Sequence, residues 1–263
     1  MAGRGVELVF APLGGVGEIG MNLALYGLGD ERNRKWIAVD LGVAFAGDDL
    51  PGIDLIFPDI RFIIEQRRNV LGIVLTHAHE DHFGALLDLW PRLRLPIYAT
   101  PFTAALLEAK RQGEPGAPDI PVNVIALNSR FTLGPFDIEL VTMAHSIPES
   151  NGLIIRTPLG TVLHTGDWKI DPTPIIGSPT DDGLGAGRET AAINGGWFRT
   201  RSRLMPAETN SSGAPITAAK PSPSPSPPPG VPRLGPQVDL FRFNSLMIFS
   251  GSSAVKNPSP LTS

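Results

Sequence analysis

The chain has 263 residues, of which 42% are hydrophobic, so it can build one large domain or two smaller ones with a packed core. It contains no cysteine, which excludes disulfides, zinc sites built on thiolates and cysteine nucleophiles. Any metal must therefore be held by nitrogen and oxygen ligands. The sequence shows neither a signal peptide nor an apolar stretch long enough to cross a bilayer, and we expect a soluble, cytoplasmic protein with no membrane partner.

The formal net charge of -4 hides an uneven distribution along the chain. Residues 1–183 hold 14 Lys and Arg against 23 Asp and Glu, a net of -9, whereas residues 184–263 hold 8 against 3, a net of +5. The second part contains the tract PSPSPSPPP and shows no periodic pattern, which is typical of disordered chain. We expect a folded domain over residues 1–183 and a low-complexity, disordered tail over residues 184–263.

The N-terminal region contains a glycine-rich motif between two apolar runs. GGVGEIG at 14–20 satisfies G-x-G-x-x-G, and Asp40 lies 20 residues beyond its last glycine, as in dinucleotide-binding units. Such a unit needs a helix after the glycines. Residues 21–28 are instead short and alternate as a strand does, and a turn-like stretch separates them from the apolar run at 36–41. The pattern favours a β-hairpin over a nucleotide site.

The remaining elements alternate between strands and helices. Residues 46–62 have the prolines and acidic residues of a solvated loop, and an apolar strand is expected at 71–76. Further helices are expected at 62–68, 83–90 and 101–110, and further strands at 96–99, 122–126, 130–133, 136–143, 153–157 and 161–165.

The strand at 71–76 leads directly into four potential metal ligands, His77, His79, Asp81 and His82. Three of the five histidines of the chain lie in this short segment, between a strand end and a helix start. A single buried histidine is most often structural. Four ligand-type residues within six positions indicate a metal site instead.

Two further residues at strand ends complete the expected site. His145 can join His77 and His79 on one ion, which gives a three-histidine site with an open position, as in catalytic zinc centres. Asp81 and His82 face a second ion, and Asp167 can bridge both. We expect Asp81, His82 and Asp167 to act in catalysis as well as in metal binding. Two divalent ions with these carboxylates and a hydroxide leave a charge of about +1, which favours an anionic phosphoester substrate.

Two residues near the site have more than one interpretation. Asp40, at the end of its strand, could orient a ligand histidine from behind or could be an exposed strand-end carboxylate. His164 lies inside the last strand, on a face that differs from that of the ligand position. We interpret it as a packing or supporting histidine rather than a ligand.

These residues resemble a known family. His77 to His82, read HAHEDH, is similar to the H-x-H-x-D-H motif of the metallo-β-lactamase superfamily, and His145 and Asp167 follow in the order of its later ligands. GGVGEIGMN, VDLG, PGIDLIFPD, HAHEDHFGA, HSIPES and HTGDWKID together look like ribonuclease J, over about residues 5–182.

The resemblance implies a fold, a cofactor and a substrate. It implies an α/β fold, the four-layer αββα metallo-β-lactamase sandwich, with two zinc ions, and RNA cleavage by endonucleolytic and 5′-to-3′ exonucleolytic routes. It also makes Ser146 and Ser150 candidate contacts to a phosphate of the substrate. A turn closed by their hydroxyls is the alternative for both serines.

The chain also departs from that family. Ribonuclease J proteins continue through the rest of the sandwich, an inserted β-CASP domain and a later histidine for the second metal, whereas no histidine follows His164 here. The second ion would keep only Asp81, His82 and Asp167. We therefore expect an incomplete sandwich and a truncated enzyme with impaired activity. The charge and composition of the chain change near Gly183. We favour an out-of-frame or wrongly predicted C-terminal part as the explanation, rather than a lineage-specific tail.

Two other functions stay open from the sequence. One is a metallo-β-lactamase-fold hydrolase of small esters or thioesters. The other is a catalytically inactive fragment that binds RNA or a protein partner, to which the +5 tail would contribute attraction. Assembly into a homo-oligomer and the replacement of zinc by manganese or magnesium are also left open.

Overall fold

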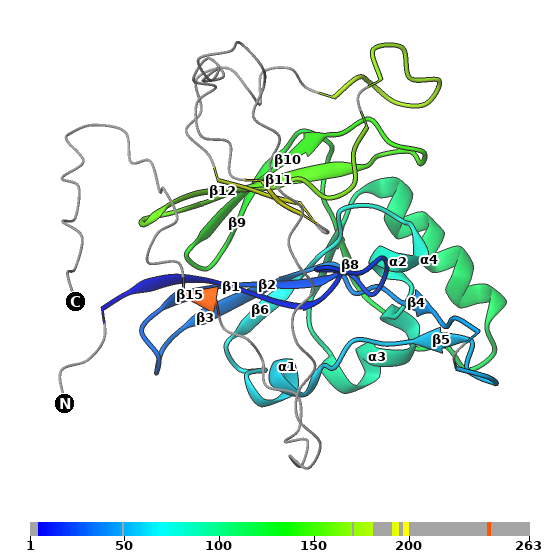
Figure 1. Ribbon diagram of the computed structural model, residues 1–263, viewed down its shortest axis with the longest axis horizontal. Coiled ribbons are helices and arrows are strands. Elements are labelled where there is room, and N and C mark those ends of the chain that lie inside the picture. The colour runs from blue at the N-terminus through cyan, green and yellow to red at the C-terminus, as the bar shows by residue number, and fades with distance from the viewer. Residues whose placement is uncertain are drawn as a thin grey trace, which may run out of the picture.

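The computed structural model describes residues 5–48, 50–169 and 171–180, together with the backbone of 191–194, 197–199 and 241–242. Two β-sheets face each other, and helices cover the outer side of one of them (Figure 1). Within the described residues the layers are helices, first sheet and second sheet. The predicted α/β sandwich is thus confirmed for these residues.

The first sheet combines an antiparallel and a parallel half. Its strand order is β15-β1-β2-β3-β6-β7-β8, and β3, β6, β7 and β8 run parallel to one another. The antiparallel pairing of β2 with β3 confirms the hairpin and excludes the dinucleotide-binding unit. The strands are β1 (Glu7–Gly14), β2 (Leu23–Gly29), β3 (Lys35–Val39), β6 (Val70–Val74), β7 (Ile97–Ala99), β8 (Val122–Val124) and β15 (Phe241–Arg242).

The second sheet is a meander extended by two short strands. Its order is β14-β13-β12-β11-β10-β9, with β9 to β12 antiparallel throughout and β12 parallel to β13. The strands are β9 (Arg130–Leu133), β10 (Phe136–Thr142), β11 (Asn151–Thr157), β12 (Gly160–His164), β13 (Ala191–Asn194) and β14 (Trp197–Arg199).

The helices pack on the side of the first sheet that faces away from the second sheet (Figure 1). They are α1 (Arg61–Glu65), α2 (Glu80–Phe83), α3 (Leu86–Leu93) and α4 (Pro101–Gly113). Among the residues that the structure describes, none of the helices combines the length and the apolar character that a bilayer-crossing segment requires.

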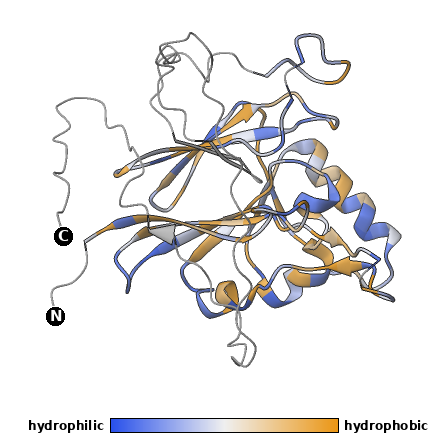
Figure 2. Ribbon diagram, viewed as in Figure 1, coloured by the Kyte–Doolittle hydropathy of each residue, from blue (hydrophilic) through white to orange (hydrophobic). Residues whose placement is uncertain are grey.

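Two hydrophobic cores follow from the alternation of the first sheet. Val9 and Leu25 belong to a helix-side core, whereas Phe10 and Tyr26 belong to an inter-sheet core with Ile138. Successive strand residues point to opposite faces, so one set of strands supplies both cores. Figure 2 shows the resulting mixture of hydrophobic and hydrophilic residues along the elements. The first sheet is therefore buried on both sides and holds the loops at its ends firmly.

Two regions differ from the sequence expectations. The 46–62 segment, expected as a loop, begins directly after β4 (Ala44–Phe45) and contains β5 (Leu55–Ile56), which pairs with β4 in a small hairpin. The tail expected from residue 184 contains β13, β14 and β15, which extend both sheets. The rest of that tail, including the proline tract and most of the apolar run at 238–249, lies outside the described residues.

Candidate metal centre

The candidate ligands, and Asp40 behind them, come from loops that follow strands of both sheets. Asp40 follows β3, and His77 and His79 follow β6, its parallel neighbour, so all three lie at one sheet edge. His145 follows β10, and Asp167 follows β12 in the second sheet. The chain must bring both sheets into place to assemble the centre.

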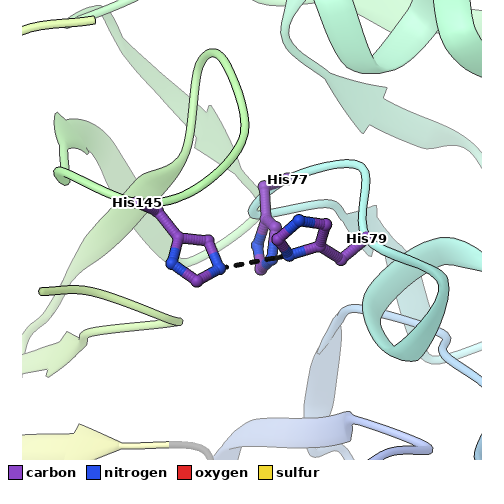
Figure 3. A group of neighbouring side chains, drawn as sticks. All are labelled: His77, His79 and His145. Atoms are coloured by element: carbon purple, nitrogen blue, oxygen red, sulfur yellow. Dashed lines mark hydrogen bonds between the residues drawn. The ribbon is translucent and has the colours of Figure 1, made fainter. Parts of the chain in front are cut away.

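His77, His79 and His145 form the first cluster, in which the three rings point toward one another (Figure 3). Nδ1 of His79 lies 3.1 Å from Nε2 of His77 and 3.1 Å from Nε2 of His145. Burial, followed by the charge of His82, lowers the pKa of His77 to about 2, and burial also lowers the pKa of His145. Both rings are therefore neutral at pH 7, the form in which imidazole binds metal.

His77, His82 and Asp167 form the second cluster, whose ligand atoms also lie within 4.8 Å of one another. Oδ2 of Asp167 is 3.5 Å from Nε2 of His82 and 3.6 Å from Nε2 of His145, so this carboxylate faces both clusters. A hydrogen bond with His82 holds the pKa of Asp167 well below its usual range. Burial alone would lower the pKa of His82, but Asp40 and Asp167 together raise it to about 10.

Asp81 belongs to neither cluster, although the sequence pairs it with His82. Its Oδ2 lies 3.5 Å from Nε2 of His82 and accepts a hydrogen bond from Nδ2 of Asn22 at 3.4 Å. The sequence predicts Asp81, His82 and Asp167 for the second cluster, whereas the structure brings His77, His82 and Asp167 together there. Asp81 remains a proposed ligand at the rim of that cluster.

Asp40 supports the ligands from behind. Its side chain is buried, and its Oδ2 lies 2.7 Å from Nδ1 of His82. The backbone N–H of Thr76 donates to Oδ1 at 2.8 Å, and the Thr76 hydroxyl lies 3.0 Å from Nδ1 of His77. The Nδ1 atoms of both rings are thereby engaged, which leaves their Nε2 atoms facing the centre. Asp40 is not the exposed strand-end carboxylate that was the alternative.

Three neighbours of the centre escape detection from spacing alone. Nδ2 of Asn22 lies 3.1 Å from Nε2 of His82 and donates to the backbone carbonyl of Asp81 at 3.0 Å. Gly42 leaves room for the same segment, because a Cβ there would stand 1.7 Å from the Asp81 carbonyl oxygen. Asn22 and Gly42 lie far from the histidine motif in sequence and Thr76 directly precedes it, but none of the three is a ligand-type residue, and only their positions near strand ends hint at their roles.

The remaining predicted residues occupy different environments. Ser146 is exposed beside His145, whereas Ser150 is buried and its hydroxyl donates to the Asp167 carbonyl at 3.3 Å. This burial favours the turn-closing role for Ser150 over contact with a phosphate. His164 is buried outside both clusters and bonds the Tyr26 hydroxyl at 2.9 Å, which fits the packing interpretation.

The donor set fits a divalent transition metal. Three imidazoles converge in the first cluster, and two imidazoles and a carboxylate oxygen converge in the second; imidazole suits zinc, copper, iron and nickel. Neutral His77 and His145 and an ionised Asp167 have the protonation states that metal binding requires, whereas His82, whose pKa is raised to about 10, must release a proton to bind an ion. The geometry thus supports hydrolytic chemistry at one or two ions.

The chain matches a model of the metallo-beta-lactamase superfamily over residues 32–210. It is 60% identical over 176 residues to a ribonuclease J from Sinorhizobium meliloti, a match that covers 67% of this chain and 31% of that protein. It is 41% identical over 181 residues to a ribonuclease J from Thermus thermophilus, covering 65% and 30%. The chain spans about a third of the length of these curated relatives.

Among solved structures, the chain is similar to the metallo-beta-lactamase fold protein YhfI from Bacillus subtilis. The TM-score is 0.43 at 16% sequence identity, and the match covers 62% of each chain. The superfamily model covers more than half of the chain, and the identity to ribonuclease J is high over the matched part. The chain therefore belongs to the metallo-beta-lactamase superfamily and corresponds, within it, to the N-terminal part of the ribonuclease J family.

Proposed function

We propose that the protein is a metal-dependent hydrolase of RNA phosphodiester bonds, with zinc as the bound ion. The observation that carries this proposal is the convergence of two ligand clusters, with Asp167 facing both. The 60% identity to a protein named ribonuclease J supports RNA as the substrate. An RNA substrate also favours a cytoplasmic location.

A divalent ion in these clusters would supply a Lewis acid that lowers the pKa of a bound water and polarises a phosphate. The protein's own residues prepare the site. Asp40 and Thr76 fix the rings of His82 and His77, so that little reorganisation is needed when a ligand enters. Asp167 stays ionised and supplies the negative charge at the centre.

Two bound divalent ions would outweigh the negative charge of the nearby carboxylates, which would favour an anionic substrate. We propose that exposed Ser146 donates a hydrogen bond to a phosphate beside the cleaved bond. Buried Ser150 would hold the loop through the Asp167 carbonyl. We also propose catalytic roles for Asp81, His82 and Asp167, whose side chains lie close together at the second cluster.

The test measures metal content and RNA cleavage together. Purified protein loaded with zinc is expected to hold one to two ions per chain and to cleave a 5′-labelled single-stranded RNA. His79→Ala should reduce cleavage by at least about 100-fold, since it removes a ligand that faces both other rings of the first cluster. His164→Asn is the matched control, because this histidine lies outside both clusters, and it should keep the metal content of the wild type.

The result also separates the two other functions. Cleavage of thioesters or lactones with no action on RNA would replace RNA by a small-molecule substrate. RNA binding that weakens with salt, without cleavage and without bound metal, would support a non-catalytic binding role. Either result would overturn the proposed activity.

A further inference from the structure

The loop that carries His145 reaches from the second sheet to the helix layer. The loop joins β10 to β11. A hydrogen bond from the Met143 N–H to the Ser150 carbonyl, at 2.9 Å, closes the base of the loop. Ile147, at its tip, packs against the helix-side core rather than the inter-sheet core. The loop therefore crosses the edge of the first sheet.

Glu149 fastens this loop to helix α4. Its Oε2 accepts a hydrogen bond from the Phe102 backbone N–H at 2.8 Å. Phe102 lies in the first turn of α4, where N–H groups have no partner within the helix, and Thr100 at the N-cap makes no capping bond with its side chain. A carboxylate at this end also interacts favourably with the helix dipole. The second sheet thus supplies the missing cap of a helix in another layer.

The backbone of Glu149 supports the same conclusion. Its φ is +56°, a left-handed conformation that costs a residue with a side chain about 1 kcal/mol. The Asn151 side chain donates to the Glu149 carbonyl at 2.5 Å, and the Asn151 backbone N–H donates to the Thr76 carbonyl at 3.1 Å. The strained turn is therefore tied to the segment that begins the histidine motif.

We propose that Glu149 is a positioning residue for the metal centre, which holds His145 in register with His77 and His79. The first cluster takes two rings from the first sheet and one from the second, so its geometry depends on how the two sheets meet at this edge. The Glu149 cap is a direct side-chain connection between the His145 loop and the helix layer. The inference rests on the proposed metal-binding function, and it adds a residue that touches no ligand.

The experiment compares zinc affinity among variants of the full chain. Competition with a chromophoric chelator gives the affinity, and the visible absorption of the Co²⁺-loaded protein reports ligand geometry. Glu149→Ala is expected to weaken zinc binding about tenfold and to change the Co²⁺ spectrum, the scale usual for supporting residues of metal ligands. Glu149→Gln keeps an oxygen acceptor for Phe102 and should recover most of the affinity.

A matched control removes an equivalent bond elsewhere. Asp59 accepts a hydrogen bond from the Arg61 backbone N–H at 2.9 Å at the start of α1, so Asp59→Ala also deletes a carboxylate from a helix start. It should leave zinc affinity and the Co²⁺ spectrum unchanged. If Glu149→Ala does not fold, Glu149→Gly removes the carboxylate while relieving the left-handed strain, and it gives the same comparison.

The outcomes distinguish this inference from the proposed function. A wild-type protein that binds neither zinc nor Co²⁺ overturns both. A wild-type protein that binds zinc while Glu149→Ala binds it equally well, with the same Co²⁺ spectrum, overturns the positioning role alone. The positioning role is supported if zinc affinity falls in Glu149→Ala, recovers in Glu149→Gln and stays unchanged in Asp59→Ala.

Discussion

At the scale of single residues, Asp40 shows how one buried charge can organise a site. A buried carboxylate is costly unless it is paired and hydrogen-bonded. Asp40 meets both conditions, since it accepts from the backbone and the hydroxyl of Thr76 and lies against His82. It also holds a left-handed backbone with φ of +62°, which Asp and Asn tolerate better than other side chains. The residue is thus matched to its place both chemically and sterically.

Asp40→Asn tests this role without changing the backbone or the size of the side chain. The amide oxygen accepts the Nδ1–H of His82 less strongly than the carboxylate does, so it orients the ring less firmly and makes the metal-facing nitrogen less basic. We expect zinc affinity to fall by about 10- to 100-fold, as measured by chelator competition. Asp30→Asn, at an exposed turn, is the control and should have no effect on affinity. Unchanged affinity in Asp40→Asn would remove Asp40 from the centre.

The ligand-type residues could be predicted from the sequence because they are dense and follow strands. The close spacing of the ligand-type residues from His77 to His82 predicts a metal site, and the places of His145 and Asp167 at strand ends predict that they join it. Asn22 and Thr76 could not be predicted in the same way, since their roles depend on pairings across 60 and 36 residues. A local pattern carries no information about such a partner.

At the scale of elements, a buried pair joins the two sheets. The Tyr26 hydroxyl of β2 and Nδ1 of His164 in β12 are 2.9 Å apart, and their rings meet edge to face. Burial raises the pKa of Tyr26 and lowers the pKa of His164 to about 4. Tyrosine is therefore the donor and neutral histidine the acceptor. Protonation of His164 would take away that acceptor.

This pair predicts a loss of stability in acid. The pKa of His164 is about 4 in the folded protein and about 6.5 in the unfolded chain, so between these values the unfolded chain binds more protons. The free energy of unfolding should fall as the pH drops from 6.5 to 4, by about 3 kcal/mol in total from this group. Urea denaturation of metal-free protein at several pH values measures it.

The control for that prediction is His164→Asn, which removes the titrating ring. Its free energy of unfolding should be lower than that of the wild type at pH 7 but should depend less on pH between 6.5 and 4. Equal pH dependence in both proteins would show that His164 does not titrate as its burial requires.

Elements with a clear periodicity of hydrophobic residues could be predicted from the sequence, and very short elements could not. The hairpin of β2 and β3, the strand β6 and the helix α4 lie close to their expected positions. The strands β4 and β5 have two residues each, too few for an alternation to be seen. β13 pairs with β12 and β14 pairs with β13, and such pairings between distant segments cannot be seen in a local sequence pattern.

At the scale of the whole molecule, the centre lies where both sheets contribute. Since the ligands of the two clusters come from three separate segments, after β6, β10 and β12, the complete set exists only in the folded protein, and metal binding must favour that state. Zinc at about 100 times its dissociation constant should add about 2.7 kcal/mol to the free energy of unfolding. Differential scanning calorimetry with zinc and with EDTA measures the shift in melting temperature.

His79→Ala is the comparison for this prediction, because it removes one ligand of the first cluster. The zinc-dependent shift should shrink in this variant. A wild-type protein whose melting temperature ignores zinc and EDTA alike would contradict metal binding to the folded state. The layered arrangement could be predicted from the resemblance of the motifs to the metallo-β-lactamase superfamily, but the distance between the clusters could not be predicted, because it is set by how two sheets pack.

The spread of the ligands along the chain also has a consequence during translation. His82 and Asp167 are 85 positions apart, and a ribosome that adds about 5–20 residues per second needs several seconds to pass from one to the other. During that interval the emerging polypeptide presents its histidine-rich motif before the acidic partner exists. A cation that bound during this interval would find an incomplete set of ligands. The complete site can therefore be loaded only after the chain has been synthesised past Asp167.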